Sequence, residues 1–128
     1  MNANVVKVLK EQLWHVATYG EEPNVVPVGF KDVTEDGKLV MGVVLMETTL
    51  KNIAANGKVA ISACDGATAE GYQVKGAAEF VTEGPVVDMF KKIAEDTFKG
   101  ALPAQGALIV TPEKVIVTTP GPDNKKLV

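Results

Sequence analysis

Hydrophobic and polar positions alternate over short segments of this chain, and glycine or proline separates most of these segments. Residues 5–13 instead repeat near the helical period, and Asn4 can cap that helix. Residues 14–19 and 24–33 are rich in β-branched and aromatic side chains, with a Gly-Glu-Glu-Pro turn between them. The pattern therefore predicts a short helix followed by two strands.

The middle of the chain predicts a hairpin and a second helix. Asp36-Gly37 is a strong signal for a tight turn, so residues 38–46 are expected to return antiparallel to the strand before it. The nearly unbroken apolar character of 38–46 indicates burial on both faces of that strand. The helical period then resumes over 48–56, where Thr48 or Thr49 can serve as the N-cap.

Further elements are predicted in the second half of the chain: strands at 58–63 and 72–80, a helix that starts at Pro85, and a hairpin of 107–110 with 114–118. Gly76 favours a bulge in the long strand. The apolar face of the helix is expected to carry Val86, Phe90, Ile93 and Phe98. Six or seven strands with two or three short helices predict a mainly β chain, organised as a single domain over 1–128 and closed into a barrel with helical covers.

Composition narrows the possible partners. Every one of the 13 cationic residues is lysine, against 16 acidic residues, and the lysines never cluster beyond pairs, so nucleic acid is not an expected partner. The longest apolar run has eight residues, whereas a membrane helix needs roughly 20, so no membrane association is expected. Because Cys64 is the single cysteine, neither a disulfide nor a Cys/His zinc cluster can form within the chain, and we expect a reducing, cytoplasmic setting.

Candidates for catalysis by side chains are few. His15, Ser62 and Cys64 are the only residues of their types, and they fall on two predicted strands that would have to aim them into one cleft. Structural roles are therefore favoured for all three. The adjacent carboxylates lie at turns or on a helix surface, where we expect them to be solvated rather than to act as an acid and a base. No side chain stands out as a general acid.

A more informative stretch is Met46-Glu-Thr-Thr-Leu-Lys-Asn-Ile53, where a buried strand gives way to a helix. Unpaired backbone N–H groups, the helix dipole, two threonine hydroxyls and Lys51 one turn later would make a modest phosphate cradle. An ordinary threonine cap, with Lys51 in solvent, is the alternative.

The second unusual stretch is Val25-Val-Pro-Val-Gly-Phe30. Proline removes a donor from a strand and glycine removes side-chain bulk. Both residues therefore mark an edge strand, a bulge or a place where a ligand approaches the backbone, and spacing alone leaves these alternatives open.

Four segments in this order resemble the pyridoxamine 5′-phosphate oxidase-like family of flavin-binding split barrels, especially its short bacterial and archaeal members. They are Pro-Asn-Val-Val-Pro-Val-Gly-Phe, Asp-Gly-Lys-Leu-Val, Thr-Thr-Leu-Lys-Asn-Ile-Ala-Ala-Asn-Gly-Lys-Val-Ala-Ile-Ser and Gly-Tyr-Gln-Val-Lys-Gly-Ala-Ala-Glu-Phe. The resemblance implies a six-stranded antiparallel split β-barrel, a homodimer, and one flavin mononucleotide (FMN) in each of two clefts between the subunits.

The resemblance also implies the site residues. Four would lie against the isoalloxazine ring, with backbone groups at its polar edge: Val26, Pro27, Val28 and Gly29. Four match the segment that holds the phosphate: Thr48, Thr49, Lys51 and Asn52. Many relatives have a basic residue where this chain has Thr48, and Lys51 lies on the same helical face. Gln73 and Lys75 match the polar face of the long strand that approaches the flavin.

The expected function is that of an FMN-binding protein, acting as a small flavin-dependent oxidoreductase or electron-transfer protein with an unidentified redox partner. Oxidation of pyridoxamine phosphate itself is not expected, because that enzyme would need an Arg/His set for the substrate phosphate and this chain has no arginine. The alternatives are a flavin-free split barrel that binds haem or a deazaflavin, and a β-barrel whose function is its interface.

Overall fold

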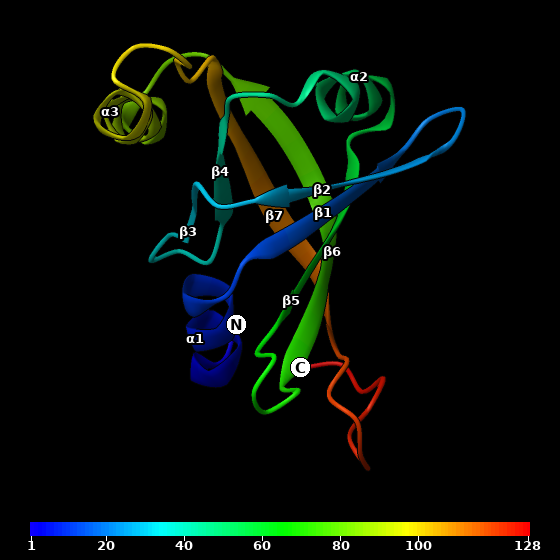
Figure 1. Ribbon diagram of the computed structural model, residues 1–128. Coiled ribbons are helices and arrows are strands. Elements are labelled where there is room, and N and C mark those ends of the chain that lie inside the picture. The colour runs from blue at the N-terminus through cyan, green and yellow to red at the C-terminus, as the bar shows by residue number, and fades with distance from the viewer.

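The computed structural model describes residues 1–128 and shows one curled antiparallel sheet with three helices (Figure 1). In chain order the elements are α1 (Ala3–Glu11), β1 (Trp14–Tyr19), β2 (Pro23–Val28), β3 (Lys31–Val33), β4 (Leu39–Val43), α2 (Glu47–Asn56), β5 (Lys58–Cys64), β6 (Gly71–Val81), α3 (Pro85–Phe98) and β7 (Gly106–Val117). The strand order across the sheet is β2-β1-β5-β6-β7-β4-β3. The chain is thus mainly β, as predicted, and its curled sheet is consistent with a split barrel.

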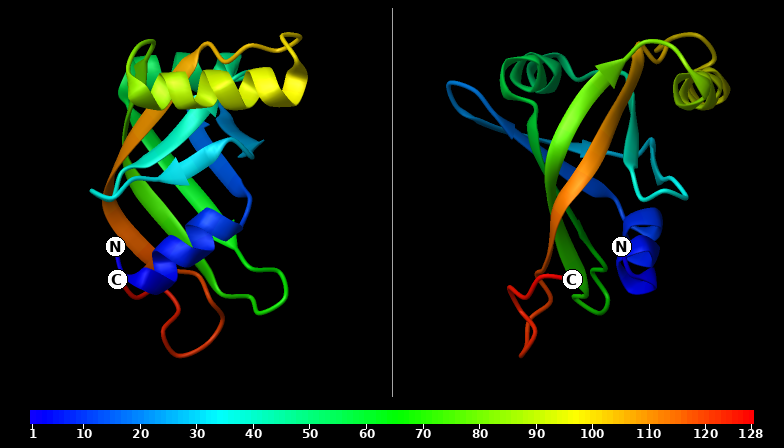
Figure 2. Two further views of the ribbon diagram at one scale, coloured as in Figure 1. Left: turned by 90° about the vertical axis from the view of Figure 1, so that its left-hand side faces the viewer. Right: turned by 180° about the vertical axis from the view of Figure 1, so that it is seen from behind.

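The helices lie at the two ends of this sheet (Figure 1, Figure 2). α2 and α3 lie at one end, whereas α1 and both chain termini lie at the other. The main core fills the concave side of the sheet and includes residues of α1, and its largest fully buried side chains are Trp14, Leu9, Leu39, Met41, Ile61 and Leu108. A smaller core around Phe90 joins α3 to the sheet.

The sheet has seven strands rather than six, because the strand predicted over 24–33 is broken. Its first part, β2, pairs with β1, and its second part, β3, pairs with β4. Gly29 and Phe30 separate the two parts. Since β2 and β3 are the two edge strands of the sheet, this short segment joins one edge to the other.

The predicted final hairpin is wrong, because β7 is one continuous strand that pairs with β6 along most of its length. The predicted break corresponds to a β-bulge, where Gly76 pairs with Pro112 and Lys75 pairs with Lys114. The bulge at Gly76 is therefore confirmed, but its extra residue, Glu113, belongs to β7. Proline is tolerated in a strand at such a bulge, where it interrupts no regular ladder.

Two helix predictions also need correction. The N-cap of α1 is Asn2 rather than Asn4, and the Asn2 side chain accepts a hydrogen bond of 3.0 Å from the amide of Val5. On α3, Ile93 was expected on the core face but is 36% exposed, and Ala94 is buried instead. The buried face of α3 is therefore shifted by about one residue from the predicted face, since positions 94 and 90 share a face at helical spacing.

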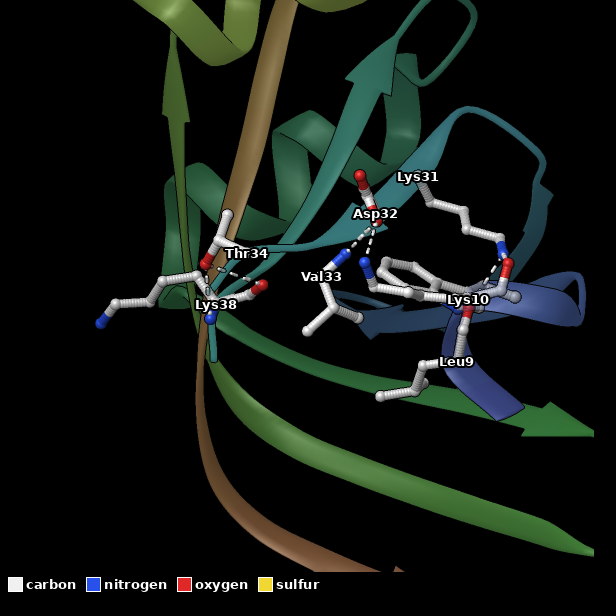
Figure 3. Close-up of polar contacts among 8 residues, drawn as sticks. Leu9, Lys10, Lys31, Asp32, Val33, Thr34 and Lys38 are labelled. Carbon is white, nitrogen blue, oxygen red and sulfur yellow. Dashed lines mark hydrogen bonds and ion pairs between the residues drawn. The ribbon is translucent and has the colours of Figure 1, made fainter. Parts of the chain in front are cut away.

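The end of α1 is fixed by a lysine from β3 (Figure 3). The Lys31 ammonium donates hydrogen bonds to the carbonyl oxygens of Leu9, at 2.8 Å, and Lys10, at 2.6 Å. The indole N–H of Trp14 donates to the same Leu9 carbonyl at 2.7 Å, and the ammonium lies 5.6 Å from the centroid of the Trp14 ring. Burial lowers the pKa of Lys31, while the charge of Asp32 acts in the opposite direction. A cation thus satisfies the free carbonyls at the negative end of the helix.

Replacing Lys31 by methionine, a side chain of similar length without the charge, tests its hydrogen bonds to the end of α1. We expect Lys31→Met to lower the free energy of unfolding by about 1–2 kcal/mol, because charged hydrogen bonds to the end of α1 are lost. Urea unfolding followed by tryptophan fluorescence measures this change. Lys7→Met, at an exposed position of α1, is the control and should leave stability nearly unchanged. Equal stability of the two variants would contradict the role assigned to Lys31.

Candidate functional site

An apolar hollow of about 340 Å³ lies where β2 meets the end of β4, and we call it the β2 hollow. No charged residue lines it. Its lining residues are Val26, Pro27, Val28, Gly29, Phe30, Gly42, Val44, Leu45, Met46, Phe98 and Leu102. The four residues predicted to contact a flavin ring are therefore together in one hollow, beside residues of β4 and α3.

The backbone of β2 explains why a hollow forms there. β2 is an edge strand, so the proline interpreted as an edge marker, Pro27, does lie in an edge strand. One side of its backbone has no strand partner, which leaves N–H and C=O groups available to a ligand. A Cβ added at Gly29 would meet no atom within 4 Å, so the backbone there opens onto free space.

The first turn of α2 begins beside this hollow. Met46 lines the hollow and is also the N-cap of α2, and no side chain caps the helix. The prediction that Thr48 or Thr49 caps the helix is therefore wrong. Thr48 and Lys51 are exposed, and so is Glu47, the acidic residue of the first turn. Uncapped N–H groups, the helix dipole, a hydroxyl and an ammonium thus gather at one end of α2.

The other two residues predicted for the phosphate are buried in a hydrogen-bond network. The Asn24 amide donates to the hydroxyls of Thr18, at 3.2 Å, and Thr49, at 3.1 Å. The Asn52 amide donates to the same Thr18 hydroxyl at 3.0 Å. A Cβ at Gly20 would lie 2.4 Å from the Asn52 side-chain oxygen, so a larger residue at this turn would displace that side chain. This network ties α2 to the β1–β2 hairpin.

The remaining predicted residues, Gln73 and Lys75, do not line the β2 hollow. Both lie on the convex face of β6, opposite to the buried Val74. Gln73 pairs across the sheet with Ser62 and Ile116. Within one chain the structure therefore separates these residues from the other eight.

Several lining residues were missed by the sequence interpretation, among them Leu45, Phe98 and Leu102. For Leu45 the sequence contained a signal. The apolar run predicted as a strand continues to residue 46, whereas β4 ends at Val43, so the last apolar residues lie outside the strand. Phe98 belonged to the predicted apolar face of the last helix, and its ring packs against Phe30 with centroids 5.6 Å apart. No local pattern indicated that this contact would form a wall of the hollow.

The three candidates His15, Ser62 and Cys64 form no hydrogen-bonded set. His15 and Ser62 are cross-strand neighbours on β1 and β5, yet their side chains share no hydrogen bond. No three His, Cys, Asp or Glu side chains lie close enough together to hold a metal ion. No helix is both long and apolar enough to cross a membrane.

Comparison with known proteins identifies the family. The sequence model of the family named for pyridoxamine 5′-phosphate oxidase matches residues 1–119, which is nearly the whole chain. The chain belongs to the pyridoxamine 5′-phosphate oxidase-like family. The resemblance seen in the sequence is thereby confirmed.

Individual relatives agree with this membership. The uncharacterized protein MJ0282 of Methanocaldococcus jannaschii is 31% identical over 135 residues, a match that covers 100% of this chain and 87% of that protein. HupZ of Group A Streptococcus is 26% identical, with a TM-score of 0.81 over 96% of this chain and 98% of its own. An FMN-binding protein of Syntrophomonas wolfei shares the fold, with a TM-score of 0.78, 14% identity, and coverage of 93% of this chain and 89% of its own.

The buried network makes a prediction about stability. Asn52→Ala removes a donor to the buried Thr18 hydroxyl, and we expect it to lower the free energy of unfolding by about 1–3 kcal/mol. Thermal and urea unfolding of the ligand-free protein measure the change. Lys51→Ala, the exposed neighbour on the same helix, should stay within about 0.5 kcal/mol of the unaltered protein. Comparable stability of both variants would contradict a structural role for Asn52.

Proposed function

We propose that this protein binds FMN in the β2 hollow and acts as a small flavin-dependent oxidoreductase or electron-transfer protein. One observation carries the proposal: an apolar hollow at an edge strand opens beside the uncapped first turn of a helix, in a chain of this family. The shared fold of the FMN-binding protein of Syntrophomonas wolfei supports it. FMN combines a flat ring with a phosphate. In this proposal the β2 hollow contacts the ring and the first turn of α2 contacts the phosphate.

The β2 hollow suits the ring. Its lining is apolar, so a planar aromatic system can lie against Pro27 and the open backbone at Gly29. The free backbone groups of an edge strand can donate to and accept from the polar edge of the ring. When bound, FMN supplies hydride and single-electron chemistry, and the chain orients it and adjusts it through such hydrogen bonds.

The first turn of α2 suits the phosphate. Helix N-termini favour anions because the free N–H groups and the dipole point toward them. Thr48 adds a hydroxyl, and Lys51, three positions later, adds a positive charge on the same face. The acidic Glu47 opposes this attraction, which makes the contribution of Lys51 more important.

A second copy of the chain completes the site in this proposal. Leu45, which lines the hollow, is 76% exposed, and Val25, next to the lining residue Val26, is 63% exposed. Exposed apolar side chains beside an apolar hollow suit a surface that another protein covers. In a homodimer each copy can contribute residues to the site of the other, and we assign this role to Gln73 and Lys75.

Pyridoxamine 5′-phosphate oxidation itself is not proposed for this chain. The β2 hollow contains no charged group that would recognise a second phosphate, and the chain has no arginine. The absorbance spectrum of the purified protein, before and after addition of FMN, is the first experiment. A spectrum without flavin bands that ignores added FMN would overturn the proposal and favour a flavin-free module for haem or a deazaflavin.

The phosphate end can be tested separately from the ring end. We expect the double variant Thr48→Ala, Lys51→Ala to bind FMN about 10–100-fold more weakly, because a charge-assisted contact and a hydroxyl contact are lost. Its affinity for riboflavin, which lacks the phosphate, should stay unchanged. Quenching of flavin fluorescence measures both affinities. Lys91→Ala, on the exposed surface of α3, is the matched control, and equal FMN affinity in all three proteins would contradict the phosphate assignment.

The second copy can be tested at Leu45. We expect Leu45→Asp to shift the protein from dimer to monomer in sedimentation velocity and to weaken FMN binding in parallel, because a charge would be buried at the interface. Leu127→Asp, at a 67% exposed position near the C-terminus, is the control and should remain dimeric. A monomeric unaltered protein, or a Leu45→Asp dimer that binds FMN normally, would contradict the proposed interface.

A further inference from the structure

A second hollow, of about 590 Å³, lies on the convex face of the sheet and shares no lining residue with the β2 hollow. Strands β1, β5, β6 and β7 contribute to it. Ala17 and Ala60 are directly opposite each other on β1 and β5 and form an apolar floor. Three lysines line it as well, Lys58, Lys75 and Lys114, and we call this hollow the lysine basin.

The β-bulge places the third lysine in the basin. Side chains of a regular strand alternate between faces, so Lys114 would share the core-facing side of Val110, four positions earlier. The extra residue Glu113 reverses this alternation, and Val115 becomes the next buried residue. Lys114 therefore turns outward and pairs directly with Lys75. Bulges commonly occur next to functional sites, where they re-aim a side chain in this way.

The charges in the lysine basin are not neutralised by the chain. Lys75 and Lys114 are direct cross-strand partners, and like charges in such positions destabilise a sheet. Lys58, whose partner is Ala77, is the diagonal neighbour of Lys75 on the same face. The two ion pairs of the structure lie elsewhere and involve none of these lysines. Glu113 also lines the basin, but it makes no ion pair with them.

We infer that the lysine basin binds the phosphate group of a small ligand, whose apolar part lies on the alanine floor. Three ammonium groups can neutralise a phosphate as point charges, whereas planar recognition of a carboxylate is the speciality of arginine, which this chain lacks. Tyr19, which is 50% exposed, forms a wall against which a flat group can pack. The site goes beyond the proposed flavin site: Lys75 is common to both, whereas Lys58, Lys114 and the alanine floor belong to the basin alone.

Phenyl phosphate, which combines a phosphate with a flat apolar group, is a suitable probe. We expect it to shift the backbone amide resonances of Ala17, Ala60 and Gly76 in a saturable way when ionic strength is held constant. The double variant Lys58→Gln, Lys114→Gln should bind it at least about tenfold more weakly, because two charged contacts are lost. Lys91→Gln, Lys92→Gln on α3 removes the same charge as a matched control and should bind normally.

Other outcomes separate this site from its alternatives. Shifts that do not saturate, or equal binding by both double variants, would overturn the proposal. Benzoate should bind more weakly than phenyl phosphate, and equal affinity would overturn the assignment to phosphate. The basin could instead be an interface between copies. In that case the Lys58→Gln, Lys114→Gln substitutions change the dissociation constant of the dimer, phenyl phosphate does not bind the unaltered protein, and the proposal fails.

The flavin site and the lysine basin can fail independently. Neither Lys58 nor Lys114 belongs to the proposed FMN contacts, so the double variant should bind FMN with unchanged affinity. A protein that binds phenyl phosphate but not FMN would leave this inference standing. The single variant Lys114→Gln should also raise the melting temperature of the ligand-free protein, because it removes the repulsion with Lys75. An unchanged or lower melting temperature would contradict the strain assigned to this pair.

Discussion

The short connection between the two edge strands is the constraint on which the rest of the structure depends. β2 and β3 lie at opposite edges of the strand order, yet only Gly29 and Phe30 separate them along the chain. Three Cα steps span at most about 11 Å, so the two edges must come close together and the sheet must curl. The curl creates the concave side that holds the core, and α1 packs into that side with Lys31 fixing its end.

The same join builds the candidate site. Gly29 and Phe30 line the β2 hollow, and the Phe30 carbonyl accepts a hydrogen bond of 2.9 Å from the amide of Gly42. A Cβ at Gly42 would lie 2.9 Å from the Phe90 ring, so β4 and α3 are in close contact behind the hollow. The join between the two sheet edges and the candidate site therefore use the same few residues.

Elements governed by local chemistry could be predicted from the sequence, as the Asp36-Gly37 turn and the Pro85 helix start show. Features that depend on contacts between distant parts of the chain could not be predicted from the sequence. The turn predicted between 110 and 114 is instead a bulge, because β7 pairs with β6 on both sides of it. In the site, the family resemblance indicated the segment 26–29, with Pro27 and Gly29 as its local signal, whereas Phe98 entered the hollow only through packing of α3. The buried positions of Thr49 and Asn52 likewise depend on the β1–β2 hairpin, which no helical pattern could indicate.

The hydrogen bonds from Asn24 and Asn52 to Thr18 have a further consequence. They connect the helix that carries Thr48 to the strand pair that carries Pro27, so buried hydrogen bonds set the spacing between the two ends of the candidate site. A ligand that contacts both ends, as we propose for FMN, would need a spacer of matching length between its ring and its anion.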